Sequence, residues 1–176
     1  PFNQGCHVTF LSQIPSPKIL LKAFADVRPV LILMVPLIME KIYKKQLVPL
    51  LEKLHMKVLM KVPVISRKIQ EKIRTRLTQA FGGTFDQIII GGAALNPEVE
   101  GFLKKIGFPF TVGYGMTECG PLISYTHAKQ HRIYSVGQPM TYLEARIDSP
   151  DPKSQDGEIQ VRGENVMSGY YKNKEA

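Results

Sequence analysis

The sequence has few cysteines and no long apolar run. Cys6 and Cys119 are its only cysteines. They form no CxxC pair, and no histidine lies nearby at metal-ligand spacing, so neither a disulfide framework nor a zinc site is indicated. The longest apolar run, residues 30–35, ends at Pro36, well short of the roughly 18–20 residues that span a bilayer. These absences favour a reducing, cytoplasmic setting and argue against a transmembrane helix.

Glycine and proline are not abundant enough for a collagen-like or low-complexity chain. There are 14 Gly and 13 Pro among 176 residues, and 44% of the residues are hydrophobic. This composition predicts a globular chain of one domain, or of one domain and part of another. The chain begins with Pro1 and has no signal-peptide pattern. We therefore expect it to be a section of a longer protein.

Acidic residues are scarce in the first half. The net charge is +8, and 14 basic residues but only 4 acidic ones lie between Lys18 and Arg76. We interpret this bias chiefly as the solvated outer faces of helices. An alternative is a basic module that binds an anionic lipid surface or another polyanion, which would allow peripheral attachment to the inner face of a membrane.

Apolar periodicity predicts alternating strands and helices up to about residue 125. A continuous apolar run such as 30–35 is typical of a strand that is covered on both faces in a parallel sheet. Asn96 is a good N-cap for a helix that starts at Pro97. Strands are expected at 7–11, 30–35, 85–90 and 108–112, and helices at 17–27, from Pro36 through 37–45, at 64–80 and at 97–106.

The pattern changes after about Tyr125. Residues 142–148 and 158–162 alternate between apolar and polar, which predicts half-buried antiparallel strands. The expected fold class is therefore α/β: a mostly parallel sheet with flanking helices, followed by the start of a small antiparallel β part. We place the boundary near residues 126–135, which divides the chain into 1–125 and 126–176.

Two glycine-rich turns follow the strands of one predicted strand-helix-strand unit. They are Gly91–Leu95 and Gly113–Glu118. A right-handed crossover places both turns at the same carboxyl edge of the sheet, where open α/β sheets bind ligands. Neither turn is a Walker loop, because no GxxxxGK[ST] occurs. Glu118 replaces the third glycine of a dinucleotide fingerprint, which disfavours a nucleotide-dependent oxidoreductase.

The residue types in these turns suit a nucleotide. Tyr114 offers an aromatic face for stacking, Thr117 a hydroxyl for a phosphate oxygen, and Glu118 a hard oxygen ligand for Mg²⁺. The alternative is that the glycines only make tight turns, Tyr114 is a core residue and Glu118 is a surface acid. Backbone could approach a flat ring closely at the small residues Gly92, Ala93 and Ala94.

Four short segments stand in order along the chain: GGAAL at 91–95, GYGMTE at 113–118, SVGQP at 135–139 and GEIQVRGENVMSGYY at 157–171. Together they resemble successive blocks of the adenylate-forming superfamily, which includes acyl-CoA synthetases. Two further segments, 22–29 (KAFADVRP) and 35–43 (VPLIMEKIY), resemble bacterial long-chain fatty-acyl-CoA synthetases.

The resemblance implies roles for individual residues. Tyr114 would stack on adenine, Thr117 would hold phosphate, and Glu118 would coordinate Mg²⁺; Thr117 and Glu118 are the implied catalytic residues. The other implied positions are the adenine pocket (Gly92, Ala93, Ala94), the rest of the nucleotide-binding turn (Gly113, Gly115, Met116) and the walls of the acyl channel (Val112, Gly113).

The family reaction joins a carboxylate to ATP, which gives an acyl-adenylate and pyrophosphate, and then transfers the acyl group to coenzyme A. The implied partners are therefore a fatty acid, ATP and coenzyme A, with no nucleic acid, and acyl carrier protein stays open as the acceptor. The family's phosphate loop, ribose-binding aspartate and catalytic-lysine domain are missing from this sequence. We therefore expect the isolated chain to be inactive. Cys119 is interpreted as a small turn residue. Most of the histidines are interpreted as surface or packing residues, and His127 is kept as a weaker candidate because it lies close to the Glu118 turn in the sequence.

Overall fold

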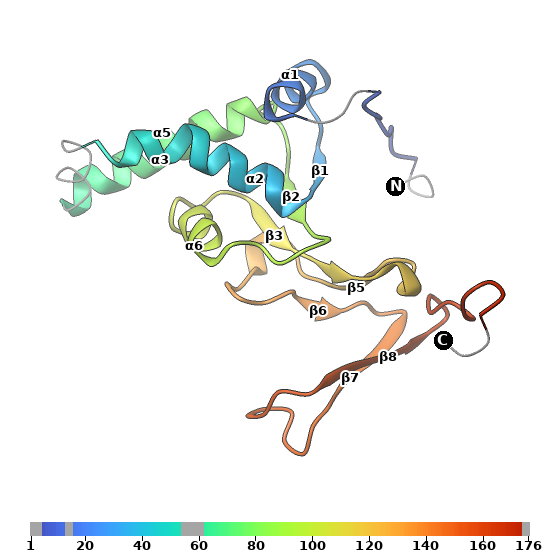
Figure 1. The fold of residues 1–176 in the computed structure, drawn as a ribbon. Helices are drawn as coiled ribbons and strands as arrows, with labels where there is room; N and C mark the ends of the chain where they lie inside the picture. Colours follow the sequence, from blue (N-terminus) through green and yellow to red (C-terminus); the bar gives the residue numbers. More distant parts are fainter. Residues whose placement is uncertain (1–4, 13–15, 54–61, 174–176) are drawn as a thin grey trace.

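The computed structural model describes residues 5–12, 16–53 and 62–173. Helices lie on one side of a parallel sheet and a smaller antiparallel sheet lies on the other (Figure 1). In chain order the helices and helical turns are α1 (Pro17–Val27), α2 (Pro36–Ile42), η2 (Tyr43–Leu47), α3 (Val48–Leu51), α5 (Pro63–Ala80), α6 (Pro97–Lys105), η3 (Thr117–Cys119) and η4 (Ala128–Gln130). The strands are β1 (Leu31–Met34), β2 (Gln87–Ile90), β3 (Phe110–Val112), β4 (Tyr114–Gly115), β5 (Leu122–Tyr125), β6 (Gln138–Pro139), β7 (Leu143–Asp148) and β8 (Glu158–Gly163).

The parallel sheet has the order β1-β2-β3. Its register places Met34 beside Ile90, and Ile90 beside Val112. The side chains of these residues share one face of the sheet, because alternate residues of a strand point to the same side. That face meets the helices and forms the core, in which Phe81 and Ile88 are fully buried. The α/β fold class with a mostly parallel sheet is confirmed.

The face of the parallel sheet that points away from the helices is covered over β3 but not over β1. Thr111 of β3 is buried, and its hydroxyl donates a hydrogen bond to the Thr126 carbonyl oxygen (2.7 Å), which ties β3 to the layer that contains β5. On the edge strand β1, in contrast, Leu31 is 46% exposed and Leu33 is 68% exposed. The expectation that residues 30–35 are covered on both faces is therefore wrong, because the antiparallel layer does not reach β1 within the described residues.

Several predicted elements are confirmed. Helix α1 has the predicted bounds, and helix α6 starts after Asn96, whose side chain accepts hydrogen bonds from the amides of Glu98 and Val99. The predicted strand at 7–11 is wrong, because the described residues of that segment form no strand.

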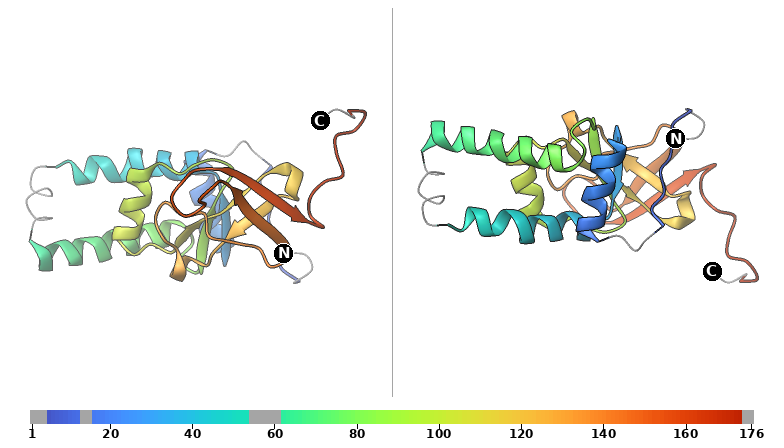
Figure 2. Two further views of the ribbon diagram at one scale, coloured as in Figure 1. Left: turned by 90° about the horizontal axis from the view of Figure 1, so that it is seen from below. Right: turned by 90° about the horizontal axis from the view of Figure 1, so that it is seen from above.

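Strands β7 and β8 pair antiparallel as predicted, over the register Leu143–Gly163 to Asp148–Glu158. Burial of their apolar face is uneven, because Leu143 and Val161 are partly buried whereas Ile147 and Ile159 are 42% and 49% exposed. The hairpin projects from the body of the molecule (Figures 1 and 2). The division of the chain into 1–125 and 126–176 stays a prediction.

The described part of the chain contains no helix that is both long and apolar enough to cross a membrane.

A buried histidine joins α6 to the loop before β6. His131 is 3% exposed, its Nε2 lies 3.1 Å from Glu100 Oε1, and its ring packs edge-on against Phe110. Lys104 Nζ donates a hydrogen bond to the carbonyl oxygen of the same histidine (2.5 Å). Burial lowers the pKa of His131, although the Glu100 carboxylate opposes this shift. The ring is therefore neutral in the folded chain at pH 7.

We expect the free energy of unfolding to decrease as the pH falls below about 6.5, the ordinary pKa of histidine. The unfolded chain takes up this proton at a higher pH than the folded chain does, so protonation favours unfolding. Urea unfolding across pH 5 to 8 measures the effect. His131→Gln should flatten the pH dependence, because it removes the buried ring whose pKa is lowered. A slope that survives His131→Gln would contradict the assignment.

Candidate nucleotide-binding site

The two glycine-rich turns meet at one edge of the parallel sheet. The Gly113 amide donates a hydrogen bond to the Ile90 carbonyl oxygen (2.9 Å), which extends the pairing of β2 with β3 beyond their last residues. A Cβ atom added to Gly91 would lie only 3.2 Å from the Gly113 carbonyl oxygen. The chain thus passes from two neighbouring strands into two adjacent turns, as the right-handed crossover predicted.

The first turn exposes backbone with very little side chain on it. Gly92 has a φ of +87°, a conformation that disfavours other residues, and it is exposed together with Ala93 and Ala94. Leu95, buried at 7% exposure, anchors the far end of the turn in the core. A planar ring could therefore lie against peptide groups here without displacing a large side chain.

The second turn is held by a short antiparallel pairing. Tyr114 pairs with Ser124 across β4 and β5, and the Met116 amide donates a hydrogen bond to the Pro121 carbonyl oxygen (2.9 Å). Gly115 packs so closely against the start of β5 that an added Cβ would overlap the carbonyl oxygen of Pro121, the residue just before this strand. Tyr114 itself is half-buried. Glycine at position 115 is therefore required by the close approach of β5 and not by a positive φ.

Glu118 lies in the helical turn η3 and is held by a segment from near the C-terminal end. The Tyr170 hydroxyl donates a hydrogen bond to Glu118 Oε1 (2.5 Å), and the Met167 amide donates one to the Glu118 carbonyl oxygen (2.8 Å). Asn165 Nδ2 donates a third hydrogen bond to the carbonyl oxygen of Cys119 (2.6 Å). The hydrogen bond from Tyr170 lowers the pKa of Glu118 below its ordinary value, so the carboxylate is ionised at neutral pH.

Sequence reasoning did not anticipate the contact between Tyr170 and Glu118. The two residues are 52 positions apart, and no spacing rule links them. The only signal was that both lie in segments that resemble blocks of one family.

The side chains beside this turn fit a magnesium ion that takes most of its ligands from the phosphates of a nucleotide and from water. Among the described residues no three His, Cys, Asp or Glu side chains cluster as a metal site. Glu118 offers one ionised carboxylate, and Thr117, exposed beside it, offers a hydroxyl. Mg²⁺ in nucleotide sites takes one or two protein carboxylates, with phosphate oxygens and waters as its other ligands. One carboxylate at the edge of a sheet is consistent with this arrangement.

The other predicted positions differ in their surroundings. Val112 belongs to the buried core, whereas Gly113 faces the gap between Ile89 and Leu122, where an added Cβ would find ordinary contact distances. Their assignment to an acyl channel stays a prediction.

His127 does not approach the Glu118 turn. Its Nε2 lies 2.9 Å from Asp86 Oδ2, just before the start of β2 and thus at the opposite edge of the sheet from Gly91. The interpretation of Cys119 as a turn residue is confirmed, since it ends η3 and is buried.

Comparison with known proteins decides the family. The family whose sequence pattern matches residues 1–171 is described as AMP-binding enzyme. The chain belongs to this family. Solved structures of the AMP-binding enzyme fold superpose on nearly the whole chain: an anthranilate CoA ligase in complex with anthranoyl-AMP covers 90% of it at a TM-score of 0.63 and 15% identity. The o-succinylbenzoate coenzyme A synthetase of Bacillus subtilis, in complex with ATP and magnesium ion, covers 90% at a TM-score of 0.59 and 20% identity.

Relatives of the chain include proteins named as long-chain acyl synthetases or ligases. Long chain acyl-CoA synthetase 1 of Arabidopsis thaliana is 36% identical over 119 residues, which cover 62% of this chain and 17% of the relative. The chloroplastic long-chain-fatty-acid–[acyl-carrier-protein] ligase AEE15 of the same plant is 38% identical over 90 residues, which cover 48% of this chain and 12% of the relative. The chain thus spans less than a fifth of the length of these relatives.

Proposed function

We propose that the chain is the nucleotide- and acyl-binding section of an ATP-dependent long-chain fatty acid–CoA ligase. The observation that carries the proposal is the meeting of two glycine-rich turns at one sheet edge, with the ionised carboxylate of Glu118 beside them. The names of the relatives support long-chain fatty acids as the substrate class. In this proposal residues 1–125 carry the nucleotide and acyl sites, and residues 126–176 begin a β subdomain.

Each part of the site has a role in this proposal. The exposed backbone of Gly92, Ala93 and Ala94 lines the adenine pocket, and Tyr114 stacks on the ring. The turn Gly113–Thr117, with Gly115 and Met116, brings the Thr117 hydroxyl to a phosphate. Val112 and Gly113 lie at the acyl channel.

Glu118 would hold Mg²⁺, which would neutralise charge on the phosphates. The Tyr170 hydroxyl donates a hydrogen bond to Oε1 and so orients this carboxylate.

The function is tested with the full-length enzyme that contains this chain. Purified enzyme should release pyrophosphate from ATP in a reaction that depends on a long-chain fatty acid and Mg²⁺, and then form the acyl thioester. The 176-residue chain alone should give only the background rate, because it lacks the family's phosphate loop and catalytic-lysine domain. Turnover by the isolated chain would contradict the expectation that it is inactive. A full-length enzyme that prefers an aromatic acid would contradict the assignment of long-chain fatty acids as the substrate class.

Acyl carrier protein is the second candidate acceptor. The observation in its favour is the relative AEE15, whose name specifies acyl carrier protein and which is 38% identical over its aligned part. Thioester formation with coenzyme A and with acyl carrier protein, compared at equal concentration, separates the two ligase activities.

Tyr114→Ala in the full-length enzyme should raise the KM for ATP about tenfold and leave fatty-acid chain-length preference unchanged. Stacking of one base on an aromatic side chain contributes about 1–3 kcal/mol in nucleic-acid complexes, and about 1.4 kcal/mol corresponds to a factor of ten. The control is Tyr171→Ala, because that side chain is 89% exposed. A change in chain-length preference with an unchanged KM for ATP would place Tyr114 at the acyl channel.

A further inference from the structure

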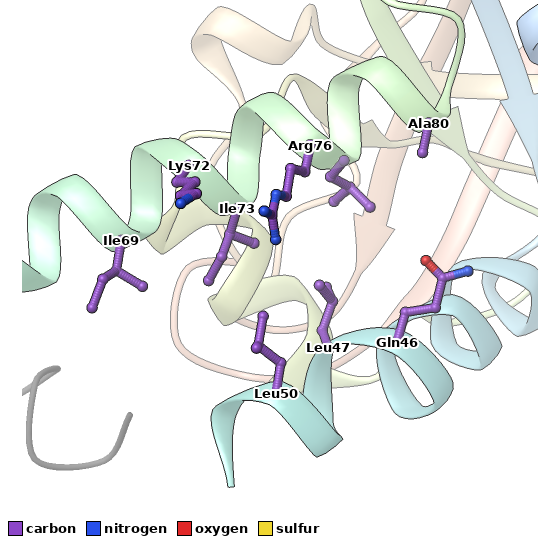
Figure 3. Close-up of a pocket in the computed structure, with 9 residues that line it drawn as sticks. Gln46, Leu47, Leu50, Ile69, Lys72, Ile73, Arg76 and Ala80 are labelled. Atoms are coloured by element: carbon purple, nitrogen blue, oxygen red, sulfur yellow. The ribbon is translucent and has the colours of Figure 1, made fainter. Parts of the chain in front are cut away.

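A cleft lies between two helical segments that extend away from the sheet. One wall is α5, and the other is formed by η2 and α3 (Figure 3). The cleft has a volume of about 360 Å³, within the range of small-molecule sites. These helices extend to the side of the molecule opposite the turn that contains Glu118 (Figures 1 and 2). The cleft is therefore separate from the candidate nucleotide site.

The interior of the cleft is mainly apolar, although Gln46 of η2 also lines it (Figure 3). Leu47 and Leu50 point from η2 and α3 toward Ile73 of α5, and Ile69 lies one turn farther along α5 (Figure 3). These side chains are already withdrawn from solvent, since Leu47 is 8% exposed and Ile73 is 5% exposed. An apolar chain of methylene groups would match these walls, and its burial would be favourable.

Two cations line the same cleft. Lys72 and Arg76 are four residues apart on α5, and Arg76 points toward the facing helix (Figure 3). Like charges at this spacing repel each other. Among the described residues no acidic side chain lines the cleft and neither cation forms an ion pair; the nearby Glu71 pairs with Arg67 instead (3.6 Å). A single anion close to both cations would relieve the repulsion.

We propose that this cleft binds one long-chain fatty carboxylate. Its hydrocarbon tail lies between α5 and the facing helix, and its carboxylate lies beside Lys72 and Arg76. This inference goes beyond the proposed function, because it assigns a second acyl site and does not depend on adenylation. A free fatty acid fits better than a bilayer surface, because the apolar side chains line the inside of a narrow cleft.

The first test measures binding of the fluorescent fatty acid cis-parinaric acid to the chain. Lys72→Gln with Arg76→Gln should weaken binding at least tenfold. The control, Lys68→Gln with Arg74→Gln, makes the same change of charge on the same helix outside the cleft and should change binding less than twofold. Undetectable binding to the unmodified chain, or equal losses in the two double variants, would overturn the proposal.

The second test uses only the unmodified chain, so it decides the proposal even if a variant fails to fold. Oleate should displace the probe at least ten times better than oleyl alcohol, which lacks the negative charge. A fatty acid that carries a photoreactive diazirine should label peptides from 46–50 or 69–80. Equal competition by the alcohol, or labelling confined to 91–118, would overturn the proposal.

A third measurement separates a fatty acid from a membrane as the source of the anion. Phosphatidylglycerol vesicles are sedimented with the unmodified chain and with both double variants. The proposal requires that the cleft variant lose affinity for cis-parinaric acid. If the cleft variant instead loses only vesicle binding, the cations serve a membrane surface and the proposal is wrong.

Discussion

Glu118→Gln in the full-length enzyme is expected to lower kcat/KM for adenylation on the order of a hundredfold, with little change in the midpoint of thermal unfolding. The amide has nearly the same shape as the carboxylate, but it lacks the charge that Mg²⁺ prefers. Loss of one group that stabilises developing charge in a transition state commonly has an effect of this size. The side chain lies in a turn and outside the core, so the fold does not depend on its charge.

Two further variants sharpen this experiment. Glu164→Gln removes an exposed carboxylate from the C-terminal segment that contacts the Glu118 turn, and it should leave the rate unchanged. Tyr170→Phe removes the hydroxyl that holds Glu118 Oε1 but keeps the ring, and it should give an intermediate loss with a higher Mg²⁺ requirement. If Glu118→Gln keeps the rate while the thermal midpoint falls, Glu118 has a structural role only.

Gly115→Ala is expected to destabilise the protein by about 1–3 kcal/mol, the usual cost of overpacking, and to abolish adenylation. The added methyl group would overlap the Pro121 carbonyl oxygen, so β4 and β5 could not keep their pairing. The turn that contains Glu118 follows directly, so the carboxylate would be displaced from the sheet edge. Urea unfolding and the pyrophosphate assay measure the two effects.

Gly101→Ala is the matched control for this substitution. Gly101 lies inside α6, and an added Cβ would meet no atom within 4 Å. Alanine is the better helix former by roughly 0.5–1 kcal/mol, so this variant should be neutral or slightly more stable. Equal behaviour of the two alanine variants would show that the close contact at Gly115 is not what holds the turn.

Local signals in the sequence predicted the elements that depend on local interactions. Helix α1 has its predicted bounds, and Asn96 caps α6 as its residue type indicated. The adjacency of the turns that start at Gly91 and Gly113 also followed from sequence, because a strand-helix-strand crossover has only one common hand. The residue types of those turns also indicate nucleotide binding without reference to the tertiary structure.

Other features could not be predicted, because they depend on residues that are distant in the sequence. The apolar run 30–35 predicts burial on two faces, yet the antiparallel layer covers β3 and leaves Leu33 of β1 exposed. A strand's own residues do not determine how far a second layer extends over it. The hydrogen bond between Tyr170 and Glu118 likewise depends on how the chain returns to η3.

The sequence by itself determined the family, the order of strands and helices in the parallel layer, and which turns carry small and acidic residues. These properties are set by periodicity, capping and residue type, which act over a few positions along the chain. Only the tertiary structure decided that Tyr170 holds Glu118, that His127 lies at the opposite edge of the sheet, and that Lys72 and Arg76 border an apolar cleft. Those contacts arise from the packing of separate elements against one another, which no local pattern specifies.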